Sequence, residues 1–183
     1  MPAKLTLVGI DPGIVDTALT AIGFDFEDKT IGIYSKVWTG VTRRENNKPV
    51  VDAAFLNMID ATVRSFRIQD TGVFVGIEGY RQRGMNVWQD QAMLALIDHL
   101  EERITFSEII DNVGMKQIVP RPLLKLFHVA RFPKSSNHAD RVSAARVALR
   151  RGIKDENINK LLSDYVLDNT EDEPWSLAFM QTL

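Results

Sequence analysis

The sequence predicts a single α/β domain over residues 1–183, with a mixed five-stranded sheet flanked by helices. Two observations favour this class. Three short β-rich segments with tight connections open the chain, which indicates that the first three strands are antiparallel. Segments with helical periodicity then alternate with further β-rich segments, and no repeat, low-complexity stretch or linker divides them.

The first three predicted strands cover Lys4–Ile10, Ala18–Phe24 and Ile31–Trp38. The first of them is largely apolar and ends at Asp11-Pro12-Gly13, a sequence that is typical of a turn after a buried strand. We expect the polar and basic segment Thr39–Pro49 to be a loop.

The rest of the chain alternates helices with strands. Apolar residues recur at helical spacing in Val50–Phe66 and in Gln89–Thr105, and Gly72–Glu78 between them is a buried strand that ends at a carboxylate. Further along, we expect a strand over Met115–Pro120, a short helix or turn over Arg121–Val129, and helices over Asn137–Arg151 and Asn157–Tyr165. Thr170 and Glu173 fit a capping box, which predicts one last helix from this point.

The composition excludes several kinds of site. The chain has no cysteine, which rules out disulfides, thiolate zinc sites, iron–sulfur clusters and a cysteine nucleophile. A metal site must therefore use oxygen ligands or one of three histidines. No Walker loop or dinucleotide-binding motif is present, so we expect no nucleotide cofactor. The absence of a signal peptide or an apolar run of ~18 residues predicts a cytoplasmic protein without a membrane partner.

The charges are segregated along the chain although the net charge is only −2. Residues 116–154 hold ten lysines and arginines against the single acid Asp140, a charge of +9, which leaves −11 for all other residues. This pattern suits a protein that places one face on a polyanion such as nucleic acid. A solvated basic helix is the alternative.

Acidic residues are concentrated at element ends. Asp11 follows the first strand, Glu78 ends the fourth, and Glu171-Asp172-Glu173 opens the last predicted helix. If the first and fourth strands are parallel neighbours, Asp11 and Glu78 converge at the carboxyl edge of the sheet. Carboxylates are preferred ligands of Mg²⁺ and Mn²⁺, and two such ions promote phosphodiester hydrolysis. Turn formation by Asp11 and helix capping by Glu173 are the structural alternatives.

Two motifs carry a resemblance to a known family. Leu7–Ala18, with Ile-Asp-Pro-Gly, and Val75–Tyr80, with Ile-Glu-Gly, resemble those of RuvC-type Holliday-junction resolvases, which belong to the RNase H-like superfamily. The resemblance implies an RNase H-like fold, catalytic carboxylates at Asp11 and Glu78, and further acids or a histidine on the last helix. It also implies that the chain resolves four-way and other branched DNA with Mg²⁺, for which Mn²⁺ substitutes. Because symmetrical resolution needs two equivalent cuts and one chain offers one acidic constellation, we expect a homodimer.

The final motif departs from the family pattern of an Asp or His, two residues, and an Asp before small and aliphatic residues. Glu173 precedes the matching apolar residues, but Thr170 stands three positions earlier. Either Asp172 or Glu171 takes the second role, or only three acids operate. We therefore take Asp11, Glu78, Asp172 and Glu173 as catalytic candidates, with Asp11, Glu78 and Glu173 as metal ligands. A competing placement of the motif uses His138-Ala139-Asp140. The divergence favours a bacteriophage or viral member of the family.

The predicted DNA contacts follow Glu78 and lie in the basic stretch. Resolvases of this type insert the loop after the glutamate into the junction, which makes Tyr80 the candidate that stacks on a base. Met85 is a second candidate, and a Tyr80 packed under the loop is the alternative. The predicted phosphate-binding residues are Arg81, Arg83, Lys125, Arg131 and Lys134. The predicted dimer patch is Val87–Leu100, which could equally be core.

Two other function classes compete with a resolvase. A catalytically inactive relative would bind nucleic acid without cutting it. An actin-like ATP-binding domain would share the Asp-x-Gly of the first hairpin, but it needs a second domain and a second phosphate loop, and neither is found in this sequence.

Overall fold

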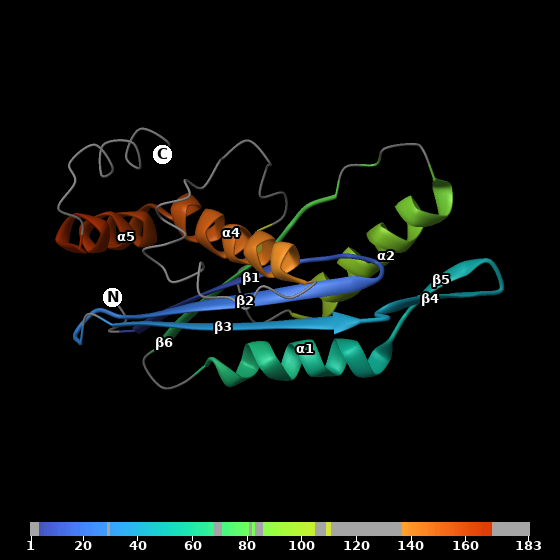
Figure 1. Cartoon of the computed structure of the whole chain (residues 1–183), viewed down its shortest axis with the longest axis horizontal. Coiled ribbons are helices and arrows are strands. Elements are labelled where there is room, and N and C mark those ends of the chain that lie inside the picture. The colour runs from blue at the N-terminus through green and yellow to red at the C-terminus, as the bar shows by residue number, and fades with distance from the viewer. Residues whose placement is uncertain are drawn as a thin grey trace.

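The computed structural model describes residues 4–28, 30–67, 71–80, 82, 86–104, 109–110 and 137–169. These residues form an α/β structure around a mixed sheet (Figure 1). Helices lie against both faces of the sheet, and its strands run along the long axis of the structure.

The first three strands form the antiparallel meander expected from the sequence. They are β1 (Lys4–Asp11), β2 (Asp16–Asp25) and β3 (Thr30–Thr39). β6 (Thr71–Ile77) lies on the other side of β1 and runs parallel to it. The central strand β1 is therefore antiparallel to one neighbour and parallel to the other.

The expectation of five full strands is wrong for the described residues. The sheet has four full strands, and only the two-residue β7 (Ile109–Ile110) extends it, parallel to β6, in the order β3-β2-β1-β6-β7. The predicted strand Met115–Pro120 lies outside the described residues.

Residues 39–49 are not the simple loop predicted. They contain most of a hairpin formed by β4 (Thr42–Glu45) and β5 (Lys48–Val51). Asn46 and Asn47 connect the strands with φ of 49° and 62°, the positive values that a type I′ turn requires. Asparagine tolerates this backbone region, so the Asn-Asn pair is the sequence signal for the hairpin.

The described helices match the predicted ones within a few residues at each end. They are α1 (Ala53–Ser65), α2 (Val87–Arg103), α4 (His138–Lys154) and α5 (Glu156–Asn169). Asp52 and Asn86 cap α1 and α2, because their side chains accept hydrogen bonds from Phe55 N at 2.9 Å and Gln89 N at 3.2 Å. In the part of the chain that the structure describes, no helix is long and apolar enough to cross a membrane. The predicted helices over 121–129 and after Thr170 lie outside the described residues.

Side chains alternate between two apolar layers along β1. Leu5 and Leu7 pack with α4 and α5, whereas Val8 and Ile10 pack with α1 and α2 on the opposite face. Figure 1 shows α4 and α5 on one side of the sheet and α1 on the other. The same parity places Asp11 on the face that α4 covers.

Helix α4 lies unusually close to the sheet because glycines stand below it. A Cβ added at Gly9 of β1 would lie 1.9 Å from the carbonyl oxygen of Ala144, and one at Gly76 of β6 would lie 3.0 Å from Arg151 Cβ. Gly9 and Gly76 are register partners, so they form one shallow track across the two parallel strands. This track sets the position of α4 over the ends of β1 and β6.

Candidate active site

Asp11 and Glu78 lie side by side at the carboxyl ends of two parallel strands. The last register pair is Ile10 with Ile77, and the Glu78 N–H donates a hydrogen bond of 2.9 Å to the Ile10 carbonyl. The next residues on both strands are therefore adjacent. Both are two residues beyond the glycines under α4, so they face the same helix. The structure thus brings together the two catalytic residues that the sequence motifs predict.

The two carboxylates share a partly buried site. The pKa of Asp11 is raised from 3.8 to about 7, first by burial and then by the negative charge of Glu78 and a hydrogen bond with it. Asp140 adds a smaller repulsion, whereas a hydrogen bond from Ser143 lowers the pKa. A pair of acids that repel each other in this way is stabilised by a proton or by a cation.

Arg150 provides a positive charge from α4. Its guanidinium Nη1 lies 3.6 Å from Glu78 Oε1, and the two side chains are only 10% and 18% exposed. The side chain of Arg150 therefore holds Glu78 on the side of the helix, while Ser143 does the same for Asp11. α4 contributes an acid, a hydroxyl and a guanidinium to the surroundings of the two carboxylates.

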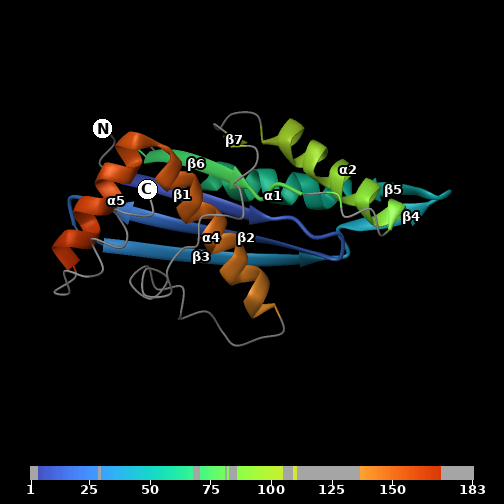
Figure 2. The same cartoon turned by 90° about the horizontal axis from the view of Figure 1, so that it is seen from above.

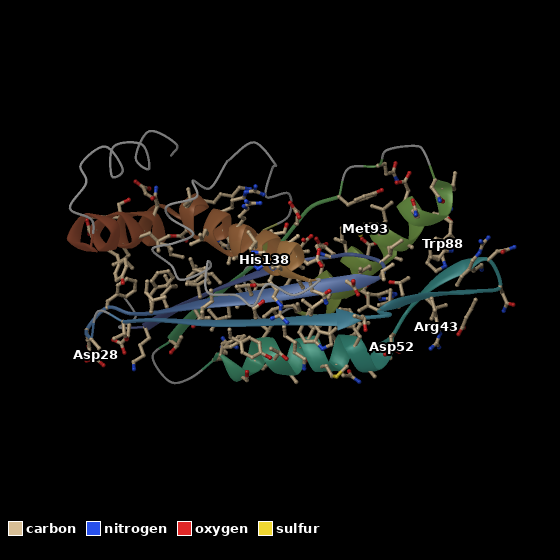
Figure 3. All side chains as sticks on the ribbon, viewed as in Figure 1. Asp28, Arg43, Asp52, Trp88, Met93 and His138 are labelled. Atoms are coloured by element: carbon tan, nitrogen blue, oxygen red, sulfur yellow. The ribbon has the colours of Figure 1, made fainter. Side chains whose placement is uncertain are left out.

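The N-terminal end of α4 corresponds to the competing placement of the final motif. Asp140 is close enough to raise the pKa of Asp11, and His138 stands at the start of the helix (Figure 3). The Nδ1 atom of His138 is buried and has no hydrogen-bond partner among the residues described. Thr170, Glu171, Asp172 and Glu173 lie outside the described residues, so both placements of the third acid stay open.

The site offers two carboxylate ligands to a metal ion from the described residues. No group of three or more histidines, aspartates and glutamates in the described segments is arranged to hold one. Asp11 and Glu78 fit a hard divalent cation by their oxygen chemistry and by their mutual repulsion. Asp140 and Glu173 stay the two candidates for a third acid.

Tyr80 contacts α2 through its hydroxyl. Its hydroxyl donates a hydrogen bond to Asp90 Oδ1 on α2, and its ring is half-buried. This contact directs the hydroxyl toward α2, and both interpretations of Tyr80 stay open. The other predicted DNA contacts, Arg81, Arg83, Met85, Lys125, Arg131 and Lys134, lie outside the described residues.

The described part of the basic stretch, residues 137–154, is less available to a polyanion than its charge suggests. Five of its ten bases lie in α4, at positions 141, 146, 150, 151 and 154. Arg150 and Arg151 are buried, and Arg151 lies over the Phe74 ring at 5.3 Å. Arg141 donates a hydrogen bond of 2.7 Å to the Ser35 carbonyl in β3, the edge strand of the sheet. Three of these five bases, Arg141, Arg150 and Arg151, are therefore buried or bonded within the folded chain.

Part of the predicted dimer patch belongs to the core. Leu96 and Leu100 are fully buried and pack with β6 residues, whereas Val87 is 70% exposed. Trp88 is half-buried at the start of α2, with the Arg44 guanidinium 5.9 Å from its ring centroid. The stretch is therefore core at Leu96 and Leu100 and surface at Val87, and the dimer patch stays a prediction.

Two site residues, Ser143 and Arg150, were not predicted from the sequence. The signal for them is the spacing of Asp140, Ser143, Val147 and Arg150, which places all four on one face of a helix. The apolar residues of this segment predict the helix. The polar residues on the shared face indicate which side chains lie near one another.

Comparison of the chain with protein-family models and with curated proteins finds no match. The function is therefore inferred from the residues and geometry of the site.

Proposed function

We propose that this chain is a divalent-metal-dependent endonuclease that hydrolyses phosphodiester bonds in branched DNA, including four-way junctions. The observation that carries the proposal is the pairing of Asp11 and Glu78 at adjacent strand ends, with the pKa of Asp11 raised to about 7. Holding two carboxylates together costs stability, and sites of this kind are concentrated in catalytic centres.

The topology supports an RNase H-like fold as part of the proposal. β1, β2 and β3 are antiparallel, β6 lies parallel beside β1, and helices cover both faces. This is the arrangement that the resemblance to RuvC-type resolvases implies for the first four strands. This strand order, together with the sequence motifs, supports the RNase H-like part of the proposal.

Mg²⁺ or Mn²⁺ is the cofactor that suits this donor set, with Asp11, Glu78 and a third acid as ligands. Bound there, such an ion lowers the pKa of a coordinated water and offsets charge on the phosphate. Ser143 orients the Asp11 carboxylate, and Arg150 orients that of Glu78. Substitution of either positioning residue should slow cleavage less than substitution of its carboxylate.

The third acid is Asp140 or Glu173, and cleavage rates separate the two. If α4 supplies the third ligand, Asp140→Asn should lower the cleavage rate more than Glu173→Gln does. If the last helix supplies it, Glu173→Gln should have the larger effect. The asparagine and glutamine variants keep the size of each side chain, so loss of charge is the only intended difference.

A catalytically inactive nucleic-acid-binding protein is the second candidate function. The paired carboxylates argue against it, because a site that only binds phosphate gains nothing from two adjacent negative charges. The two candidates differ in one measurable property, which is turnover on a branched substrate.

The test is cleavage of a synthetic four-way junction and of the matching linear duplex, each with Mg²⁺, Mn²⁺ or EDTA. We expect junction cleavage with either metal and none with EDTA, and no cleavage by Asp11→Asn or Glu78→Gln. Asp98→Asn, which changes an exposed aspartate on α2, is the matched control and should cut normally. Either site variant with near wild-type turnover in Mg²⁺ would overturn the assignment.

A further inference from the structure

The β4–β5 hairpin extends beyond the end of the main sheet (Figures 1 and 2). We propose that it is a DNA-binding arm that contacts the phosphate backbone of a duplex outside the cleavage site. This inference rests on the proposed function, because that function makes DNA the substrate. The hairpin itself was not among the DNA contacts expected from the sequence.

The charge of the hairpin differs from that of its surroundings. It carries Arg43, Arg44 and Lys48 against Glu45, a net charge of +2 over residues 42–51. Outside the basic stretch 116–154 and this hairpin, the chain has 9 bases and 22 acids. A local excess of lysine and arginine on an otherwise acidic part of the chain matches the chemistry of phosphate groups.

The charged residues are at the surface, where a duplex can reach them. Residues 43–48 are all exposed, and the side chain of Arg43 is 61% exposed. Arg43 Nε lies 2.6 Å from Glu45 Oε1, which orients the guanidinium along the hairpin. An exposed ion pair of this kind contributes little to stability, so replacing it with a phosphate contact loses little free energy.

The hairpin is firmly attached to the domain. Val41 and Val51 at its base are buried in the core, and the Asp52 N–H donates a hydrogen bond of 2.9 Å to the Val41 carbonyl. The Arg44 guanidinium lies 5.9 Å from the centroid of the Trp88 ring, a cation–π contact that ties the arm to α2. Side chains held in place before binding lose less conformational entropy when a ligand arrives.

The hairpin and the acidic pair stand at the same end of the sheet. β3 ends at Thr39, which pairs with Asp16 at the start of β2, and Asp11 pairs with Ala18 two residues further along. The hairpin follows β3 directly, and the start of α2 lies next to it, with Arg43 and Trp88 labelled in Figure 3. A duplex arm that leaves the cleavage site in this direction passes the hairpin.

The experiment measures DNA affinity over a salt series in EDTA, so that no cleavage occurs. Arg43→Ala and Lys48→Ala are compared with Lys160→Ala, which removes an exposed lysine from α5 on another part of the chain. If each residue binds a phosphate, each hairpin variant should lower the salt slope by about one and weaken binding about 3–10-fold at 0.1 M salt. Lys160→Ala should change neither quantity.

Two further variants keep the proposal testable if the alanine changes disturb the hairpin. Arg43→Lys retains the charge and should keep most of the affinity, whereas Arg43→Gln should not. Thermal unfolding confirms that each variant is folded. Folded Arg43→Ala and Lys48→Ala proteins with wild-type affinity and salt slope would overturn the proposal, and the hairpin would then be a site for a protein partner or a structural element.

Failure of this proposal is distinct from failure of the proposed function. If the wild type cuts junctions but the hairpin variants bind DNA normally, only the DNA-binding arm is refuted. If DNA binding depends on the hairpin but the wild type cuts no branched DNA with Mg²⁺ or Mn²⁺, only the proposed nuclease activity is refuted.

Discussion

Asp11 links the stability of the protein to pH, because burial and Glu78 raise its pKa from 3.8 to about 7 in the folded chain. Between these two values the folded chain holds a proton that the unfolded chain has released. The free energy of unfolding therefore falls as the pH rises from about 4 to about 7, and the loss is complete above the folded pKa.

Asp11→Asn removes this titration. In EDTA, we expect the variant to exceed the wild type in unfolding free energy by about 1–3 kcal/mol at pH 8. The difference should shrink toward zero as the pH falls to 4, because the protonated aspartate resembles asparagine. Urea unfolding at pH 4, 6 and 8 measures it, with Asp98→Asn as the control whose difference from the wild type stays constant. An Asp11→Asn gap that is independent of pH would contradict a raised pKa.

Tyr80 has two separable parts, a hydroxyl that binds Asp90 and a ring that could stack on a base. Asp90 is only 9% exposed, so Tyr80→Phe leaves a buried carboxylate short of one donor and should cost about 1–3 kcal/mol of stability. The ring remains, so the ratio of junction to duplex affinity should not change.

Tyr80→Ala removes the ring as well. If the ring stacks on an unpaired base, a contribution of ~1–3 kcal/mol, the preference for junction over duplex should fall while the salt slope stays constant. Binding to both substrates across a salt series measures these quantities. An unchanged preference in a folded Tyr80→Ala protein would assign the role to another residue, with Met85 the next candidate.

At the scale of elements, the close contact between α4 and the sheet determines the geometry of the site. Gly9→Ala would place a Cβ 1.9 Å from the Ala144 carbonyl oxygen and 2.3 Å from the Ala148 nitrogen. Because both atoms belong to the helix backbone, α4 must move as a whole. We expect a loss of about 3 kcal/mol in unfolding free energy and slower cleavage, because Ser143 and Arg150 move with the helix.

Gly32→Ala is the matched control for this prediction. Gly32 also lies within a strand, β3, but no atom would come within 4 Å of an added Cβ. This variant should keep the stability and the cleavage rate of the wild type. Equal effects of the two substitutions would show that α4 does not depend on the glycine at position 9.

The elements also show how far local sequence determines this fold. The strands around Asp11 and Glu78 were predictable because each is a short apolar run that ends at a turn or at a carboxylate. The β4–β5 hairpin was missed because its polar strands lack an apolar alternation, and only Asn46 and Asn47 mark the turn. Helical spacing places Ser143 and Arg150 on one face with Asp140. Their position over Asp11 and Glu78 depends on glycines in two strands that are distant in the sequence, so local sequence does not predict it.

At the scale of the whole molecule, the number of bases in a segment does not show which of them can contact a nucleic acid. Ten bases stand in residues 116–154, but two of them, Arg150 and Arg151, are buried. The hairpin carries only three bases, Arg43, Arg44 and Lys48, and all three are exposed. Exposure therefore matters more than charge density when a polyanion-binding surface is inferred.

The proposed reaction also predicts the oligomeric state. Resolution of a four-way junction requires two equivalent cuts, and one chain of 20.7 kDa has one pair of strand-end carboxylates in the described residues. A homodimer with two-fold symmetry is the simplest way to supply two sites. Light scattering should therefore show two chains per junction. A single chain, both free and on a junction that it nevertheless cuts symmetrically, would contradict this expectation.

The central claim is that Asp11 and Glu78 act as one unit in junction cleavage. The most direct test is a double-mutant cycle on the single-turnover cleavage rate of a four-way junction in Mg²⁺, with Asp11→Asn, Glu78→Gln and the double variant. Residues that act together are strongly non-additive, so each single change should lower the rate on the order of 10³-fold or more, with little further loss in the double variant. Independent, multiplicative effects, or a near wild-type rate in either single variant, would contradict the claim.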